Sequence, residues 1–248
     1  MDIIWNIDDE DIKKVNQLLK ENDNPFLRKR KERNIDRQGI VIDIDTIIHS
    51  MLMCLLTSQQ RSNSGSRVSK FLRKKPFPIT ITTIEEAKDV RNFITETLRE
   101  NELTRYINRI SDFFAENMKK IEGDNWAIIE KLKVLKYKPS KKNERVLADY
   151  LDNWLKGFGP KQSRNFLQSL GLTRYEIPID SRITKWLNNF GFPVTLTSGS
   201  LGNTGYYHFV SDGIQILTEK AGTYPCLLDA AIFSSFDNKG WTEENIVY

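Results

Sequence analysis

One lysine and one aspartate, Lys161 and Asp180, stand 19 positions apart, and each is expected at the start of a helix. The exposed N–H groups at a helix N-terminus have a partial positive charge, which is unfavourable for a lysine ammonium group. This repulsion and any burial both lower the pKa of the amine, so more of it is neutral. The sequence therefore indicates a nucleophilic lysine followed by a carboxylate.

The residues around Lys161 predict a sharp turn that leads into a helix over 160–170. Gly157 and Gly159 allow a backbone turn without Cβ clashes, and Pro160 suits the first helical position because its φ is already set. An amphipathic run follows, and Gly171 ends it. Lys161 thus belongs to the first turn of this helix.

Asp180 has two interpretations that are compatible with each other. The chain must be extended after Pro178, and an aspartate directly before Ser181 is a favoured N-cap for a helix over 181–190. The second interpretation is a carboxylate kept ionised by the helix dipole, where it could activate a nucleophile or stabilise a developing cation.

Two stretches of the chain are informative together. They read Leu155-Lys-Gly-Phe-Gly-Pro-Lys161 with Ile177-Pro-Ile-Asp180, and Leu55-Leu-Thr-Ser-Gln-Gln-Arg-Ser-Asn-Ser-Gly-Ser-Arg-Val68. Over about residues 40–190 they resemble the helix-hairpin-helix DNA glycosylases of base excision repair, whose signature is a Gly/Pro-rich hairpin followed by an essential aspartate. The resemblance implies that Lys161 and Asp180 are catalytic. Their interval is most similar to that of the 8-oxoguanine DNA glycosylases that lack an iron–sulfur cluster.

The same resemblance implies where DNA is bound. One of two glutamines fills the space left by an extruded base, and the hairpin holds a backbone phosphate through exposed amides. The hairpin carbonyls are expected to bind a monovalent cation. The residues expected to contact DNA are Gln59, Gln60, Arg61, Gly157, Phe158 and Gly159. For the two glutamines, an ordinary polar role at a helix end is the alternative.

A glycosylase of this kind extrudes the damaged base and attacks C1′ of its sugar. Neutral Lys161 would displace the base and leave an imine that can eliminate the 3′ phosphate, which gives an associated AP lyase activity. This chemistry requires no redox cofactor and no metal. Cys54 and Cys226 are too few for the four-cysteine cluster of the endonuclease III branch.

Two aromatic residues near the C-terminus are candidates for the base pocket. Phe233 and Phe236 could stack on a flipped base, as aromatic residues do in similar proteins. Their i, i+3 spacing is also that of two core residues on one helix, which is the commoner role. The resemblance favours 8-oxoguanine as the base that is removed.

The fold class that the sequence predicts is all-α, because apolar residues recur at three- and four-residue spacing in most segments. The expected helices cover 8–21, 43–59, 63–73, 83–99, 102–120, 124–135, 142–156, 160–170, 181–190, 205–221 and 225–236. Residues 22–42 are expected to form a loop or an irregular connection, and residues 192–205 an exposed loop. Two lobes are expected, 60–142 and 1–59 plus 143–248, with the active site in the cleft between them.

Composition is that of a globular protein, with 248 residues, 39% hydrophobic and 28% charged residues, and a net charge of +4. Basic runs at 28–33, 73–75 and 136–142 could meet phosphates or form ordinary solvated surface. No signal peptide and no apolar stretch of membrane-spanning length is expected. Cys54 and Cys226 are interpreted as buried thiols of an intracellular protein, cytoplasmic, nucleoid or nuclear.

The expected partner is double-stranded DNA with a damaged base. The protein is expected to act as a monomer and to have no membrane partner. Three alternatives stay open. The chain could be a glycosylase for another damaged or modified base, a non-catalytic helix-hairpin-helix module that grips phosphate, or a helical scaffold for protein interactions. His49 and His208 have no metal-ligand spacing and are expected to make local hydrogen bonds.

Overall fold

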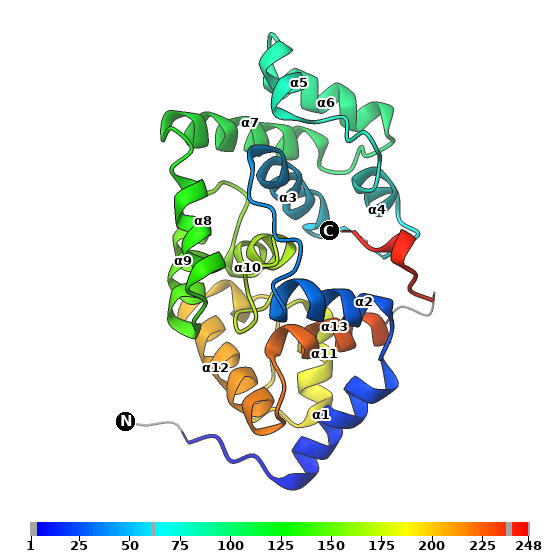
Figure 1. Ribbon diagram of the computed structural model, residues 1–248, viewed down its shortest axis with the longest axis vertical. Coiled ribbons are helices and arrows are strands. Elements are labelled where there is room, and N and C mark those ends of the chain that lie inside the picture. Colours follow the sequence, from blue (N-terminus) through cyan, green and yellow to red (C-terminus); the bar gives the residue numbers. More distant parts are fainter. Residues whose placement is uncertain (1–3, 61–62, 237–239, 248) are drawn as a thin grey trace.

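Figure 1 shows the computed structural model of the chain, which describes residues 4–60, 63–236 and 240–247. Within these ranges all regular secondary structure is helical, which confirms the predicted all-α class. The α-helices are α1 (Asp9–Glu21), α2 (Pro25–Arg30), α3 (Ile44–Thr57), α4 (Arg67–Leu72), α5 (Ile81–Glu86), α6 (Val90–Glu100), α7 (Ile107–Gly123), α8 (Ile128–Tyr137), α9 (Lys141–Trp154), α10 (Pro160–Ser169), α11 (Ser181–Phe190), α12 (Thr204–Lys220) and α13 (Pro225–Ser235). Shorter turns are the π-helix η1 (Lys31–Ile35) and the 3-10 turns η2 (Ser200–Gly202) and η3 (Glu243–Asn245).

Short polar side chains define where most of these helices begin. In each case the side-chain oxygen accepts a hydrogen bond from a backbone N–H of the first turn, which would otherwise have no partner. The capping residues are Asp8, Asn24, Asp43, Ser66, Thr80, Asp89, Ser140, Asp180 and Asn203. Local sequence therefore determines most helix starts.

The prediction of a loop over residues 22–42 is wrong, because α2 and η1 occupy residues 25–35. Asn24 caps α2 and Pro25 takes its first position, which are both ordinary helix-start signals. The helix then widens into a π-helical turn in which Asn34 is fully buried and donates hydrogen bonds to Gln168 and Thr173 carbonyls. Tertiary contacts therefore stabilise a segment whose basic composition suggested a connection.

Several other helices differ from their predicted bounds, and α4, α7 and α8 begin four or five residues later than expected. The segment expected as one helix over 83–99 forms α5 and α6, because Ala87 is extended and Asp89 caps a new helix. The helix expected over 43–59 ends at Thr57, where Ser58 becomes extended and Gln59 takes a left-handed φ of 58°. The second change matters for the site because it turns the chain after α3.

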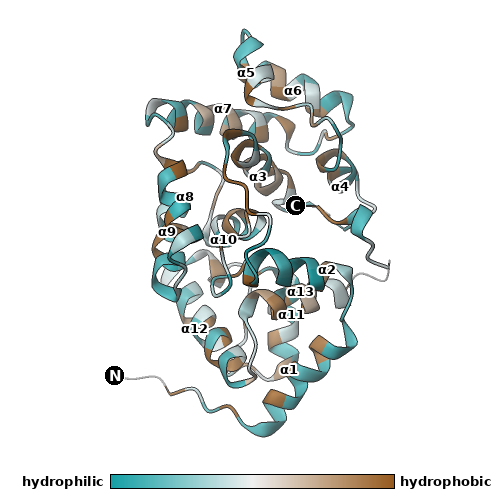
Figure 2. Cartoon of the chain, viewed as in Figure 1, coloured by the Kyte–Doolittle hydropathy of each residue, from teal (hydrophilic) through white to brown (hydrophobic). Residues whose placement is uncertain are grey.

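The buried apolar side chains form two clusters. The first contains residues between Ile40 and Leu172 and centres on α3, whose hydrophobic residues Figure 2 shows in brown. The second joins α1 to α11, α12 and α13. The expected lobes 60–142 and 1–59 plus 143–248 stay a prediction, because a hydrophobic cluster does not by itself define a domain.

Helix α10 occupies the middle of the molecule in Figure 1 and packs against α3 and α9. Its apolar residues Phe166, Leu167 and Leu170 belong to the first cluster, whereas Ile177 and Ile179, which follow it, belong to the second. The segment from α10 to the start of α11 therefore crosses from one cluster to the other. In the described part of the chain, no helix combines the length and apolarity that crossing a bilayer requires.

Candidate active site

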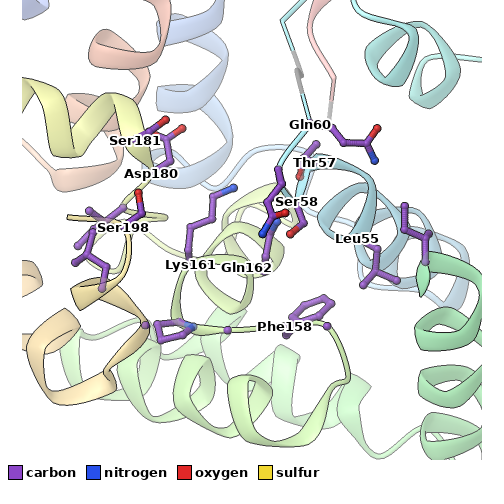
Figure 3. Close-up of a pocket in the computed structure, with 18 of the residues that line it drawn as sticks. Leu55, Thr57, Ser58, Gln60, Phe158, Lys161, Gln162, Asp180, Ser181 and Ser198 are labelled. Carbon is purple, nitrogen blue, oxygen red and sulfur yellow. The ribbon is translucent and has the colours of Figure 1, made fainter. Parts of the chain in front are cut away.

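A cavity of about 780 Å³ lies between five parts of the chain. These are the turn after α3, the start of α7, the loop before α10, the start of α11 and the segment 198–202 that includes η2. Lys161 and Asp180 both line this cavity, together with Gln59, Gln60 and Phe158. Figure 3 shows Lys161 between Asp180 on one side and Ser58 and Gln162 on the other. The structure thus brings together most of the residues that the sequence singles out.

Lys161 lies in the first turn of α10, as the sequence predicts, and its side chain is half-buried. Burial lowers the pKa of the Lys161 amine below its ordinary value of 10.5, while the negative charge of Asp180 opposes this shift and the positive charge of Arg182 adds to it. No carboxylate lies within ion-pair distance of the amine among the residues that the structure describes. Burial therefore increases the fraction of this lysine that is in the neutral, nucleophilic form.

Asp180 is the N-cap of α11, which confirms the first of its two interpretations. Its Oδ1 accepts hydrogen bonds from the backbone N–H groups of Arg182 at 2.8 Å and Ile183 at 3.2 Å. Its Oδ2 accepts one from the Arg182 Nε at 2.9 Å. These bonds fix the orientation of a carboxylate whose side chain is 18% exposed.

Two side chains of other helices form hydrogen bonds with the backbone of the segment before Asp180. The Tyr207 hydroxyl donates a hydrogen bond to the Ile177 carbonyl and accepts one from the Ile179 N–H, both at 2.7 Å. Glu144 accepts hydrogen bonds from the three consecutive N–H groups of residues 174–176. Burial raises the pKa of Glu144 to about 7 although these bonds favour its ionised form.

A buried arginine joins the helix of Lys161 to the segment that leads to Asp180. Arg164 is 0% exposed, and its guanidinium pairs with Glu176 at 3.0 Å and with Asp149 at 2.8 Å. It also lies over the Tyr207 ring, at 4.8 Å from the ring centroid. Because Glu176 also pairs with Arg145 at 2.8 Å, this network links α9, α10 and the extended segment.

The hairpin before α10 requires a glycine at its first bend. Gly157 has a φ of +76°, and a Cβ there would meet the Phe113 ring at 2.4 Å and Leu55 at 2.8 Å. Asn117 of α7 fixes the preceding residue, since it accepts a hydrogen bond from the Lys156 N–H at 2.7 Å and donates one to the Lys156 carbonyl at 3.0 Å. The hairpin is thus anchored to α7 by close packing and by hydrogen bonds.

Carbonyl oxygens suit a hard cation, but the Lys156 carbonyl of this hairpin already accepts a hydrogen bond. Cation binding at the hairpin therefore stays a prediction. Within the described ranges, no group of three His, Cys, Asp or Glu side chains is arranged to hold a metal ion. Cys54 and Cys226 are buried free thiols, as the sequence predicts.

The turn after α3 meets the start of α7 across the cavity. Gln59 has a left-handed backbone, and the Gln60 side-chain amide donates a hydrogen bond to the Arg105 carbonyl at 3.4 Å. The Arg61 position lies outside the described residues. Both glutamines therefore line the cavity, and their role towards DNA stays a prediction.

The sequence analysis missed Tyr106, which stands at the start of α7. It has a left-handed φ of 59°, and the residue is 37% exposed. Two guanidiniums face this ring, Arg105 at 5.0 Å and Arg109 at 4.4 Å from the centroid, and both arginines line the cavity. The available signal in the sequence was the group Arg105, Tyr106 and Arg109. Nothing in the local sequence predicts the left-handed backbone of Tyr106.

A smaller recess of about 110 Å³ adjoins the large cavity, because Thr57, Lys161, Asp180 and Arg182 line both. Three aromatic residues that contact one another also line this recess: Phe26, Phe233 and Trp241.

Of the two predicted pocket aromatics, only Phe233 lines the recess, where its ring stacks on Phe26 and lies 3.9 Å from the Arg182 guanidinium. Phe236 is 42% exposed and lines neither cavity. Both histidines make hydrogen bonds and line neither cavity. His49 bonds the Leu72 carbonyl, and His208 pairs with Asp149.

Solved structures of 8-oxoguanine DNA glycosylases share this helical fold. The structure is similar to that of Tm1821, the 8-oxoguanine DNA glycosylase of Thermotoga maritima, with a TM-score of 0.63 and 17% identity over 94% of this chain and 99% of that chain. Methanocaldococcus jannaschii 8-oxoguanine DNA glycosylase gives a TM-score of 0.61 and 13% identity over 94% and 98% of the two chains.

A structure of the Methanocaldococcus jannaschii 8-oxoguanine glycosylase/lyase in complex with a 15mer DNA containing 8-oxoguanine also matches, with a TM-score of 0.61 and 15% identity over 93% of this chain and 99% of that chain. No protein-family model matches the sequence, and the comparison with curated proteins gave no match. Identities this low establish the shared fold, whereas the activity has to be argued from the site.

Proposed function

We propose that this protein is a base-excision DNA glycosylase with an associated AP lyase activity, and that Lys161 is its nucleophile. The observation that supports this most directly is the pair Lys161 and Asp180 in one cavity. The amine has a lowered pKa, and the carboxylate is oriented by a helix start. The shared fold with 8-oxoguanine DNA glycosylases supports 8-oxoguanine as the substrate.

The reaction follows from these two groups. The neutral Lys161 amine attacks C1′ of the damaged nucleoside, the N-glycosidic bond breaks, and the base leaves with the bonding electron pair and takes up a proton. The Asp180 carboxylate stabilises the positive charge that develops on the sugar. Loss of a proton from nitrogen and opening of the sugar give an imine. Removal of a C2′ proton then breaks the C3′–O bond and releases the 3′ phosphate, so the steps use no redox cofactor and no metal.

Double-stranded DNA would lie over the large cavity. Helix α10 presents the N–H groups of its first turn next to Gly157, Phe158 and Gly159, which suits a backbone phosphate. The Arg105 and Arg109 guanidiniums beside Tyr106 supply positive charge for phosphates. We expect the protein to act as a monomer on DNA inside the cell.

Borohydride trapping tests the proposal. The purified protein is incubated with duplexes that contain 8-oxoguanine, thymine glycol, uracil or only undamaged bases, and borohydride then reduces any imine to a stable covalent adduct. We expect an adduct with the 8-oxoguanine duplex, and no adduct for Lys161→Gln. An adduct that persists in Lys161→Gln would refute the role of this lysine.

A non-catalytic helix-hairpin-helix module is the second candidate, because the hairpin is well formed whether or not catalysis takes place. It predicts tight, salt-dependent duplex binding without any adduct. In that case Lys161→Gln would change affinity alone.

A further inference from the structure

Two neighbouring arginines at the C-terminal end of α10 have no carboxylate partner. Arg37 lies in the loop between η1 and α3, Arg174 lies between α10 and α11, and both are half-buried. Neither side chain forms an ion pair with a residue that the structure describes. By contrast, a carboxylate lies 3.0 Å or less from each of three other buried or half-buried arginines: Arg30, Arg145 and Arg164.

The Arg37 guanidinium is enclosed, and most of its hydrogen-bonding capacity is unused. Its Nη1 donates to the Gly171 carbonyl at 3.4 Å, which is long for an N–H···O bond. Its Nε and Nη2 are shielded from solvent and have no hydrogen-bond partner in the described part of the chain. Burial lowers the pKa of Arg37, and the positive charge of Arg174 lowers it further. The charged form of Arg37 is therefore poorly compensated by its surroundings.

The Arg174 guanidinium is the accessible member of the pair. Its Nε is shielded and has no partner, whereas its two Nη atoms are open to solvent and make no hydrogen bond with the described residues. The Tyr175 and Tyr224 rings lie 6.0 and 5.7 Å from this guanidinium, which is the outer limit of a cation–π contact. These rings therefore leave the two Nη atoms available as donors to a ligand.

Glu144 is an acidic side chain whose charge acts on Arg37, but it does not neutralise the two arginines. Its oxygens already accept hydrogen bonds from the backbone N–H groups of residues 174–176. Burial also raises the pKa of Glu144 to about 7, so part of it is uncharged at neutral pH. The arginine pair therefore retains an excess of positive charge.

The chemistry of two adjacent guanidiniums favours a phosphate group as their ligand. Partly buried charges of the same sign repel each other and are costly without a counter-charge. A phosphate monoester or free phosphate has between one and two negative charges at neutral pH, and its several oxygens match the donors of a guanidinium. A single carboxylate has one charge and would leave one of the two guanidiniums uncompensated.

We propose that Arg174 and Arg37 form a second anion site that binds a phosphate group, with the Arg174 Nη atoms as direct donors and Arg37 as the enclosed charge behind them. The site lies at the C-terminal end of α10, where Arg37 bonds Gly171, whereas Lys161 stands in the first turn of this helix, which is about 15 Å long. Neither arginine lines the large cavity or the recess. The site is therefore separate from the proposed active site and does not depend on the proposed glycosylase function.

Calorimetric titration with inorganic phosphate, followed by thermal melts, tests the proposal. At about ten times its dissociation constant, phosphate should raise the Tm of the wild-type protein by about 3–6 °C above the value in chloride of equal ionic strength. Arg174→Gln should weaken phosphate binding by about 10- to 100-fold, because it removes charge-assisted hydrogen bonds. This substitution keeps the backbone groups of Arg174 that bond Glu144 and Cys226, so the fold should be retained.

Two further variants show which property of the arginines matters. Arg174→Lys keeps the charge but loses the planar fork of donors, and should bind phosphate with an affinity between those of wild type and Arg174→Gln. Arg37→Gln should cause a smaller loss than Arg174→Gln, because the Arg37 donors are enclosed. Lys142→Gln, which removes one positive charge from an exposed lysine of α9, is the matched control.

General stabilisation by phosphate, which is excluded from protein surfaces, would be common to all the variants. An Arg174→Gln protein that binds phosphate as tightly as wild type and Lys142→Gln would therefore overturn the proposal, as would a wild-type protein without measurable phosphate binding. Adenosine 5′-monophosphate as a second probe distinguishes the source of the group. Equal affinities that both depend on Arg174 would support a site for phosphate alone, and tighter binding of the nucleotide would support a nucleotide site.

Discussion

Replacing Tyr207 by phenylalanine removes a single oxygen that holds the chain directly before Asp180. The side chain is 0% exposed, and its hydroxyl makes two hydrogen bonds of 2.7 Å, to the Ile177 carbonyl and from the Ile179 N–H. Phenylalanine keeps the ring and its packing, so the change isolates these two bonds. Both backbone groups would then be buried without a partner.

The expected cost follows from those two groups. A buried polar group left without a partner costs about 1–3 kcal/mol, so Tyr207→Phe should lower the free energy of unfolding by about 3 kcal/mol. For a chain of this length that corresponds to a fall in Tm of about 6–12 °C. Urea denaturation and a thermal melt measure the two values.

The same variant should affect the chemistry. Asp180 stands one residue after Ile179, and a displacement of about 1 Å in a catalytic group can cost about 100-fold in rate. We therefore expect borohydride trapping with a preformed abasic site to slow by about 10- to 100-fold, at a temperature where the variant is still folded. Tyr206→Phe, whose hydroxyl makes no hydrogen bond with the described residues, is the matched control.

Two outcomes would contradict this reasoning. A Tyr207→Phe protein as stable as wild type would mean that the two bonds contribute no net stability. A less stable protein that traps the abasic site at the wild-type rate would mean that the segment 177–179 does not position Asp180.

Three further predictions concern other parts of the framework. The rate of imine formation should rise with pH as the Lys161 ammonium loses its proton, and the midpoint of this rise should lie below 10.5. Arg182→Gln should move the midpoint upward, because it removes a positive charge that lowers the pKa of Lys161. An unchanged midpoint in a pH–rate profile on abasic DNA would argue against this coupling. The folded state raises the pKa of Glu144 from 4.5 to about 7. The protonated Glu144 therefore stabilises the fold at low pH, and about 3 kcal/mol of unfolding free energy is lost as the pH rises from 4.5 to 7. Urea denaturation at pH 4.5 and pH 7.5 should therefore show a smaller loss for Glu144→Gln than for wild type. Gly157→Ala should lower the free energy of unfolding by at least about 2 kcal/mol, since the new Cβ would lie 2.4 Å from Phe113 and the backbone φ is +76°. Gly159→Ala should leave the free energy of unfolding nearly unchanged, because nothing lies within 4 Å of its new Cβ. Equal urea midpoints for the two alanine variants would contradict the packing argument.

The positions of Lys161 and Asp180 at two helix starts were predictable because their signals are local. Gly157, Pro160 and the helix start place Lys161, and Pro178 with a following aspartate places the cap of α11. Such turn and cap signals extend over a few residues and need no knowledge of the rest of the chain. The direction of the Lys161 pKa shift follows from the same position together with burial.

The residues that hold the pair in place were not predictable in this way. The Tyr207 hydroxyl bonds an N–H 28 positions earlier in the chain, and Glu144 bonds N–H groups 30–32 positions later. Neither residue differs in type or local pattern from an ordinary helix residue. Tyr106 was missed for a related reason, because its left-handed backbone depends on the packing of the loop before α7 and not on its own type.

Lys161 and Asp180 lie at a junction between the two hydrophobic clusters. Lys161 stands on a helix of the first hydrophobic cluster, whereas Asp180 follows the isoleucines of the second. The direct link between them is the buried Arg164–Glu176 pair, in which both side chains are 0% exposed. Removing one partner of such a pair leaves an uncompensated buried charge and costs about 3–5 kcal/mol. Breaking this ion pair should therefore destabilise the fold, and it should also loosen the connection between the helix of Lys161 and the segment that leads to Asp180. We therefore expect stability and the proposed chemistry to depend on one junction between the two clusters.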